Sequence, residues 1–141
     1  MARYLGIDYG ERRIGIAISD PSLTIAQPFT TITWQSKKDL MNKLREIVQE
    51  YDVERVVIGL PLTMGGRNSQ KTVEVRNFVE KLTKIISVPI VFQDERLTTK
   101  QAYLTMRQGG KKPSRNKEKV DQLAAQFILQ SYLDREKNLD K

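Results

Sequence analysis

The pattern of hydrophobic and polar positions begins with three strands. Residues 3–8 form an apolar run that ends at Asp8 and predicts a buried strand. Residues 13–19 alternate isoleucine with smaller residues, which indicates a half-buried strand. Residues 27–34 are rich in Thr, Ile, Phe and Trp, which favour a pleated surface, and predict a third strand. Three strands in succession indicate an antiparallel meander.

Helices and strands alternate in the next part of the chain. Ser36 and Asp39 have the spacing of a capping box before apolar residues at helical intervals, which predicts a helix to about residue 50. Residues 53–60 are apolar without alternation, as in a strand covered on both faces. Residues 89–93 predict a fifth strand, and the helix before it carries an apolar stripe. That stripe consists of Val75, Phe78, Val79, Leu82 and Ile86.

Two further helices complete the predicted pattern. A capping box at Thr98 predicts one that ends at a Gly-Gly pair, and Ser114 opens a last helix to about Asp134. We therefore expect one compact domain over residues 1–134. Its α/β fold combines the antiparallel meander with parallel strands in a five-stranded mixed sheet flanked by helices. Residues 135–141 are expected to form a frayed tail.

The composition narrows the possible chemistry. The 141 residues include no cysteine and no histidine, which removes disulfides, thiolate nucleophiles and the commonest general base and zinc ligand. Asp and Glu oxygens remain, and these ligands suit Mg²⁺ or Mn²⁺ rather than zinc. The sequence has no apolar run that would span a bilayer and no signal segment, so we expect a soluble, cytoplasmic protein with no membrane partner.

Positive charge is concentrated in one segment. The chain has 24 Lys and Arg against 17 Asp and Glu, a formal net charge of +7. Residues 96–119 account for the whole excess, because they hold eight basic residues and one acid. The basic residues are Arg96, Lys100, Arg107, Lys111, Lys112, Arg115, Lys117 and Lys119. Such a block is compatible with nucleic-acid contact and equally with a plain solvated face.

Three carboxylates stand where the predicted elements could bring them together. Asp8 ends the first strand and Glu95 follows the fifth, so both are expected at the carboxyl edge of the sheet, where open α/β sheets bind ligands. Asp121 lies inside the last helix, towards its apolar stripe, where a carboxylate is costly unless it is paired or binds a metal. Each also has a simpler explanation. Asp8 would cap a turn, Glu95 would pair with Arg96, and Asp121 would pair with Lys117.

Together the three carboxylates are compatible with a nuclease. Divalent cations held by them would activate water and neutralise the charge that develops on a phosphodiester. Spacing alone does not show that the carboxylates converge, so a noncatalytic nucleic-acid-binding module remains open at this point.

Four motifs of the chain resemble the YqgF family. They are Gly6-Ile-Asp8-Tyr-Gly10-Glu-Arg-Arg13-Ile-Gly15-Ile-Ala17-Ile-Ser19-Asp20, Gly59-Leu-Pro61, Asp94-Glu95-Arg96-Leu-Thr98-Thr99 and Val120-Asp121-Gln-Leu-Ala124-Ala125, in the order of the family. Its members are described as pre-16S rRNA nucleases and as Holliday-junction-resolvase-like proteins. The resemblance implies a ribonuclease H-like fold and a nuclease using Mg²⁺ or Mn²⁺ in 5′-end maturation of 16S ribosomal RNA. It assigns catalysis and metal binding to Asp8, Glu95 and Asp121, with pre-rRNA or a ribosomal particle as partner.

A substrate-binding surface is also expected from the resemblance. Arginine binds phosphate bidentately, and a glycine-rich loop at residues 65–68 would expose backbone amides. The expected phosphate-binding residues are Arg13, Arg67, Asn68, Arg96, Lys111, Lys112 and Arg115. A plain surface connection is the alternative for the loop.

Other functions remain as alternatives. One is a Holliday junction resolvase acting on branched DNA, as a dimer. The resolvases usually carry a further acid on the turn of the helix where this chain has Ala124 and Ala125, which argues against a full two-metal site. Another is an actin-like or sugar-kinase-like ATPase, because Asp8-Tyr-Gly10 with Arg13 resembles the first phosphate loop of those proteins. Such ATPases close two domains around the nucleotide, however, and we expect one domain here. We expect a monomer or a weak homodimer.

Overall fold

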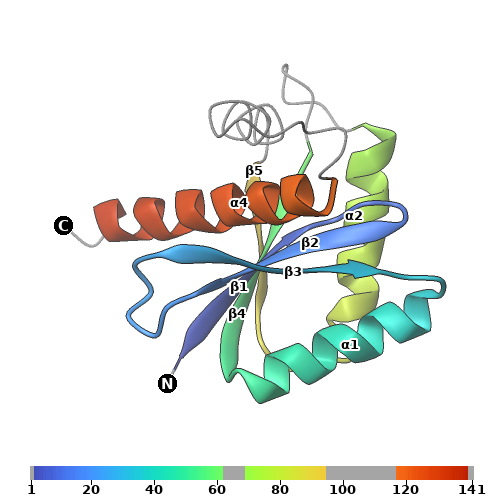
Figure 1. Cartoon of the computed structure of the whole chain (residues 1–141), viewed down its shortest axis with the longest axis horizontal. Helices are drawn as coiled ribbons and strands as arrows, with labels where there is room; N and C mark the ends of the chain where they lie inside the picture. The colour runs from blue at the N-terminus through green and yellow to red at the C-terminus, as the bar shows by residue number, and fades with distance from the viewer. Residues whose placement is uncertain (1, 62–68, 95–116, 140–141) are drawn as a thin grey trace.

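A twisted five-stranded sheet with helices on both faces forms the body of the molecule (Figure 1). The computed structural model describes residues 2–61, 69–94 and 117–139. The strand order is β3-β2-β1-β4-β5. Strands β1 (Arg3–Asp8), β2 (Arg13–Ser19) and β3 (Ala26–Thr33) form an antiparallel meander, and β4 (Val53–Leu60) and β5 (Ile90–Asp94) run parallel to β1. The mixed sheet predicted from the sequence is confirmed.

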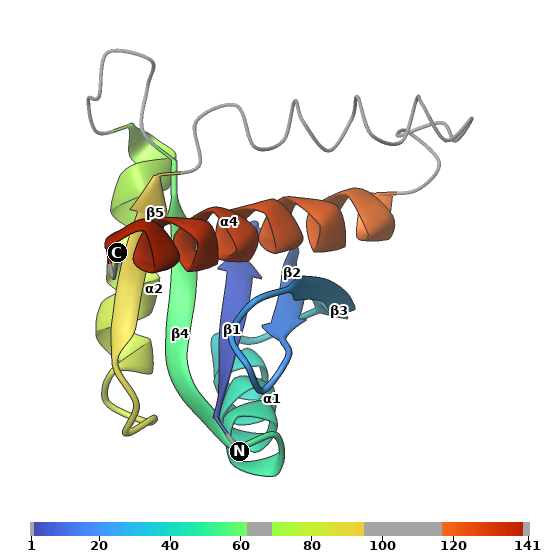
Figure 2. The ribbon, with the colours of Figure 1, turned by 90° about the vertical axis from the view of Figure 1, so that its left-hand side faces the viewer.

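The described helices divide between the two faces of the sheet (Figure 2). Helices α1 (Lys37–Glu50) and α2 (Gln70–Leu82) pack against one face through residues such as Leu44 and Phe78, whereas α4 (Lys117–Leu139) crosses the other. Successive side chains of β1 point to opposite faces of the sheet. Leu5 and Ile7 enter the core beneath α1 and α2, and Tyr4 enters the core beneath α4. No helix in the described ranges is long and apolar enough to cross a membrane.

Side-chain caps fix where two helices begin. Ser36 Oγ accepts a hydrogen bond of 3.2 Å from the amide of Asp39, so α1 begins where the sequence predicts. Ser69 and Thr72 form a capping box at the start of α2. The hydroxyl of Thr72 also donates to the carbonyl of Pro61, directly after β4. The first turn of α2 is therefore held at the carboxyl edge of the sheet.

Several predicted boundaries need correction. Strand β3 covers Ala26–Thr33 instead of residues 27–34, and β5 covers Ile90–Asp94 instead of residues 89–93. Ile86 is buried as expected but lies beyond α2, which ends at Leu82. The helix predicted from Thr98 lies outside the described residues.

Helix α4 is longer than predicted, because it continues past Asp134 to Leu139 instead of fraying from Arg135. A contact from β4 explains the difference. Arg55 Nη1 donates to Glu136 Oε1 at 2.6 Å and to the Tyr132 hydroxyl at 2.7 Å. The same guanidinium lies 5.0 Å from the centre of the Tyr4 ring. These contacts tie the last turns of the helix to the sheet.

Two glycines let α4 lie against the backbone of the sheet. A Cβ added at Gly6 would stand 2.7 Å from Leu129 Cβ and 2.9 Å from the carbonyl oxygen of Ala125. One added at Gly15 would overlap the carbonyl group of Asp121 and stand 2.9 Å from its Cβ. A side chain at either position would push the helix away, so both glycines are required by the packing.

Replacing Gly15 with alanine is expected to destabilise the protein more than the same change at Gly6. A Cβ at Gly15 would overlap the carbonyl group of Asp121, whereas the nearest atom at Gly6 is Leu129 Cβ at 2.7 Å, so the helix would have to move further at Gly15. Overpacking of this kind costs about 1–3 kcal/mol. Urea unfolding monitored by circular dichroism measures the difference. Without a clash, a Gly→Ala substitution lowers the entropy of the unfolded chain and slightly favours folding. A Gly15→Ala variant that is as stable as wild type would therefore contradict the predicted overlap with α4.

Candidate functional site

Asp8 and Asp121, two of the three predicted carboxylates, both lie next to Gly15 at the carboxyl edge of the sheet. Asp8 is the last residue of β1, and its Cα is paired with that of Gly15 on β2. Asp121 packs directly on Gly15, because a Cβ added at that glycine would overlap the carbonyl group of Asp121. Gly6, two residues before Asp8, faces α4, so strand alternation places the Asp8 side chain on the same face.

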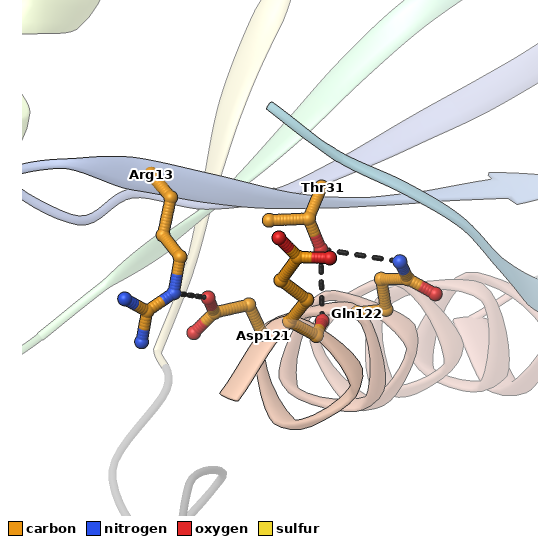
Figure 3. Close-up of polar contacts among 5 residues, drawn as sticks. Arg13, Thr31, Asp121 and Gln122 are labelled. Atoms are coloured by element: carbon orange, nitrogen blue, oxygen red, sulfur yellow. Dashed lines mark hydrogen bonds and ion pairs between the residues drawn. The ribbon is translucent and has the colours of Figure 1, made fainter. Parts of the chain in front are cut away.

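An ion pair with Arg13 holds the Asp121 carboxylate (Figure 3). Arg13 is the first residue of β2, and its Nε donates to Asp121 Oδ2. The side chains of Arg13 and Asp121 are 33% and 19% exposed. Burial raises the pKa of the Asp121 carboxyl group above its ordinary value, against the opposing effects of the Arg13 hydrogen bond and charge and of the Lys71 charge. The expectation that a carboxylate here needs a partner is met by Arg13.

Polar contacts with β3 fix the turn of α4 that carries Asp121. Thr31 Oγ1 donates to the carbonyl of Glu118 at 2.8 Å, and Gln122 Nε2 donates to the same hydroxyl at 3.1 Å (Figure 3). One turn later, Gln126 Nε2 donates to the carbonyl of Ala26 at 3.0 Å. These contacts lie on both sides of Asp121 in the sequence, so its backbone is held against movement along the sheet.

A cavity of about 510 Å³ opens beside Asp121. The turn between β1 and β2 forms one wall, and the first two turns of α2 form another. The lining residues are Tyr9, Gly10, Glu11, Arg12, Arg13, Gln70, Lys71, Glu74 and Asp121. Tyr9 is buried against Phe78 with 4.6 Å between ring centres, and its burial, with smaller effects of Glu74 and Glu11, raises the pKa of its hydroxyl. The cavity therefore joins Asp121 to a charged wall on α2.

Lys71 and Glu74 were missed by the sequence reasoning. Nothing in the local sequence connects the start of α2 with a residue of α4, because the two meet only through the folded sheet. The available signal was Ser69 with Thr72, which marks a helix starting shortly after the end of a strand.

The remaining predicted site residues lie outside the described part of the chain. They are Glu95, Arg67, Asn68, Arg96, Lys111, Lys112 and Arg115. β5 ends at Asp94, which is paired with Leu60 at the end of β4, so the chain leaves β5 at the edge that carries Asp8. Within the described residues no group of three acidic side chains is placed to hold a metal. Asp8 and Asp121 are nevertheless hard oxygen donors of the kind that bind Mg²⁺ and Mn²⁺.

We expect Arg13→Gln to destabilise the protein at neutral pH by about 1 kcal/mol, allowing for solvent screening. Removing Arg13 takes away two influences that lower the pKa of Asp121, so this pKa rises further. A carboxyl group whose pKa is raised on folding destabilises the folded state when ionised. The loss is therefore largest at pH 7 and shrinks as the pH falls through the Asp121 pKa.

Urea unfolding at pH 7 and at pH 4 tests the effect, with Arg12→Gln as the control. Arg12 is exposed, and its side chain forms no hydrogen bond or ion pair with the described residues. Equal losses in the two variants, or a loss for Arg13→Gln that does not change with pH, would refute the role of the ion pair.

Sequence relatives match this chain over almost its whole length. A protein of Caldanaerobacter subterraneus subsp. tengcongensis, named "Putative pre-16S rRNA nuclease", is 47% identical over 137 residues, covering 96% of this chain and 99% of that protein. One of Chloroflexus aggregans with the same name is 44% identical over 134 residues, covering 95% and 94%.

Solved structures and a family model agree with these relatives. RuvC of Thermus thermophilus bound to a Holliday junction substrate superposes with a TM-score of 0.62 at 16% identity, over 98% of this chain and 97% of that one. The fowlpox virus resolvase bound to Holliday junction DNA gives 0.58 at 10% identity, over 94% and 97%. At these identities the likeness shows the fold alone, which is ribonuclease H-like. A model of the RuvX family, described as Holliday junction resolvase, matches residues 2–135. The chain therefore belongs to the RuvX family, also known as YqgF.

Proposed function

We propose that this protein is a metal-dependent endonuclease that hydrolyses phosphodiester bonds during 5′-end maturation of pre-16S ribosomal RNA. The observation that supports the proposal is that Asp8 and Asp121 both neighbour Gly15 at the carboxyl edge of a ribonuclease H-like sheet. The names of relatives at 44% and 47% identity support the choice of RNA.

Asp8, Glu95 and Asp121 are the proposed metal ligands and catalytic carboxylates. A bound Mg²⁺ or Mn²⁺ would supply activation of water and neutralisation of the charge developing on the phosphate. Asp121 suits this role because its burial makes the ionised form costly, so a nearby cation is favoured. The chain has no histidine to act as a general base, which is consistent with reliance on carboxylates.

Arg13 would position Asp121 and bind substrate at the same time. Its Nε holds the Asp121 carboxylate, while the side chain also lines the cavity. Its two terminal nitrogens form no hydrogen bond with the described residues, so they can donate to a phosphate. The other proposed phosphate-binding residues are Arg67, Asn68, Arg96, Lys111, Lys112 and Arg115, and the proposed setting is the cytoplasm, on pre-rRNA or a ribosomal particle.

Cutting of DNA junctions is the second candidate function, favoured by the description of the family model. The helix argues against it. Ala124 and Ala125 are 1% and 0% exposed, so the next turn of α4 after Asp121 has no space for a further carboxylate.

Asp8→Asn is expected to lower RNA cleavage at least ~100-fold, because it weakens a metal ligand without changing the volume of the side chain. The substrates are a 16S rRNA precursor, naked and in an immature small-subunit particle, and a four-way DNA junction. Each is assayed with Mg²⁺, Mn²⁺ or EDTA. Asp134→Asn is the matched control, since this exposed residue of α4 lies about 20 Å along the helix from Asp121.

Cleavage of the RNA that is lost in EDTA and in Asp8→Asn, but kept in Asp134→Asn, would support the proposal. Cleavage of the junction alone would establish the resolvase function in its place. If the wild-type protein cuts neither substrate in any metal, the nuclease proposal is wrong and a binding role replaces it.

A further inference from the structure

We infer that the cavity beside Asp121 is a phosphate subsite for the RNA strand, in which Lys71 and Arg12 bind a phosphodiester next to the one that is cut. The inference rests on the nuclease function proposed above. Lys71 would add a substrate contact from α2, which the predicted site does not include, in the cavity that Asp121 also lines.

The fold fixes Lys71 at this place. Its neighbour Thr72 is fully buried and donates its hydroxyl proton to the Pro61 carbonyl, while Ser69 Oγ lies 3.4 Å from the same oxygen. The start of α2 is thereby fastened to the end of β4. Lys71 is exposed and lines the cavity, so its backbone is rigid while its ammonium group remains accessible.

Among the cations that line the cavity, Lys71 and Arg12 form no side-chain hydrogen bond or ion pair with the described residues. Arg13 is engaged by Asp121. Lys71 forms no ion pair with Glu74 in the described structure, although the two are three positions apart on the helix, within reach of each other. The side chain of Arg12 likewise has no polar partner among the described residues, and only its carbonyl is used, by the amide of Trp34 at 3.0 Å.

The charged residues that line the cavity are of both signs. The acids are Glu11, Glu74 and Asp121, and the cations are Arg12, Arg13 and Lys71. The ion pair between Arg13 and Asp121 engages one residue of each sign. Lys71 and Arg12 are therefore the cavity cations proposed to bind the phosphate.

The shape and lining favour the backbone of a nucleic acid over a base. A volume of about 510 Å³ is sufficient for a nucleotide unit. Tyr9, the aromatic residue among those that line the cavity, is 5% exposed and packed on Phe78, so it offers no ring face for stacking. Charged side chains that contact phosphates fix the register of a strand without reading its sequence.

Binding without metal tests the subsite separately from catalysis. The probe is a fluorescein-labelled single-stranded fragment of the 16S precursor, titrated in EDTA at several KCl concentrations and followed by anisotropy. We expect Lys71→Gln to weaken binding roughly 3- to 10-fold and to reduce the slope of log K against log salt by about 0.7, the loss of one phosphate contact on a single strand. Arg12→Gln should have a similar effect, and in the double variant the slope of log K against log salt should fall by about 1.4.

Lys81→Gln is the matched control. Lys81 lies in the last turn of the same helix and is exposed, so the substitution removes the same charge away from the cavity. An unchanged slope for Lys81→Gln, with a reduced slope for Lys71→Gln and equal thermal stability of both variants, supports the subsite. Equal slopes for the two variants overturn it, as does a wild-type protein that does not bind the fragment.

The two proposals fail in different ways. A protein that binds RNA through Lys71 but cuts neither RNA nor DNA would overturn the nuclease function and leave the phosphate subsite in place. A protein that cuts RNA and loses this activity in Asp8→Asn, with no special effect of Lys71→Gln on the salt slope, would overturn only the subsite.

Discussion

The close packing of α4 on the backbone of β1 and β2 is the constraint on which the candidate site depends. Gly15 has two roles in it, because it is the partner of Asp8 in the sheet and lies directly beneath Asp121. The glycine that permits the contact therefore has both Asp8 and Asp121 as neighbours. A side chain at residue 15 would push α4 from the sheet, and with it Asp121 away from Asp8. The packing of this glycine therefore also controls the geometry of the candidate site.

The same contact creates an electrostatic problem that other elements resolve. A helix lying this close to the sheet buries much of Asp121, and burial raises the pKa of its carboxyl group. Arg13, at the start of β2, supplies the opposite charge. At the far end of the helix, Arg55 contacts Glu136 and Tyr132, so α4 is held to the sheet by charged contacts at both of its ends.

Local patterns predicted much of the fold, and the failures occurred where the determining contact is distant in sequence. β1, β2 and β4 have the predicted ends, because continuous or alternating apolar runs define a strand locally. The need of Asp121 for a partner was also evident from its position on the helix. Its partner, Arg13, was not evident because 108 residues separate the two. The extension of α4 depends likewise on Arg55, which is 81 residues from Glu136.

The packing of α4 also limits where the ligands of a metal site can come from. The residues that follow Asp121 by one turn, Ala124 and Ala125, are buried, and the carbonyl of Ala125 would lie 2.9 Å from a Cβ at Gly6. A carboxylate at either position would bury a charge within the contact between helix and sheet. One turn after Asp121, this face of α4 therefore offers no further carboxylate. In the proposed site the further donors come from the ends of strands, with Asp8 at the end of β1 and Glu95 predicted directly after β5.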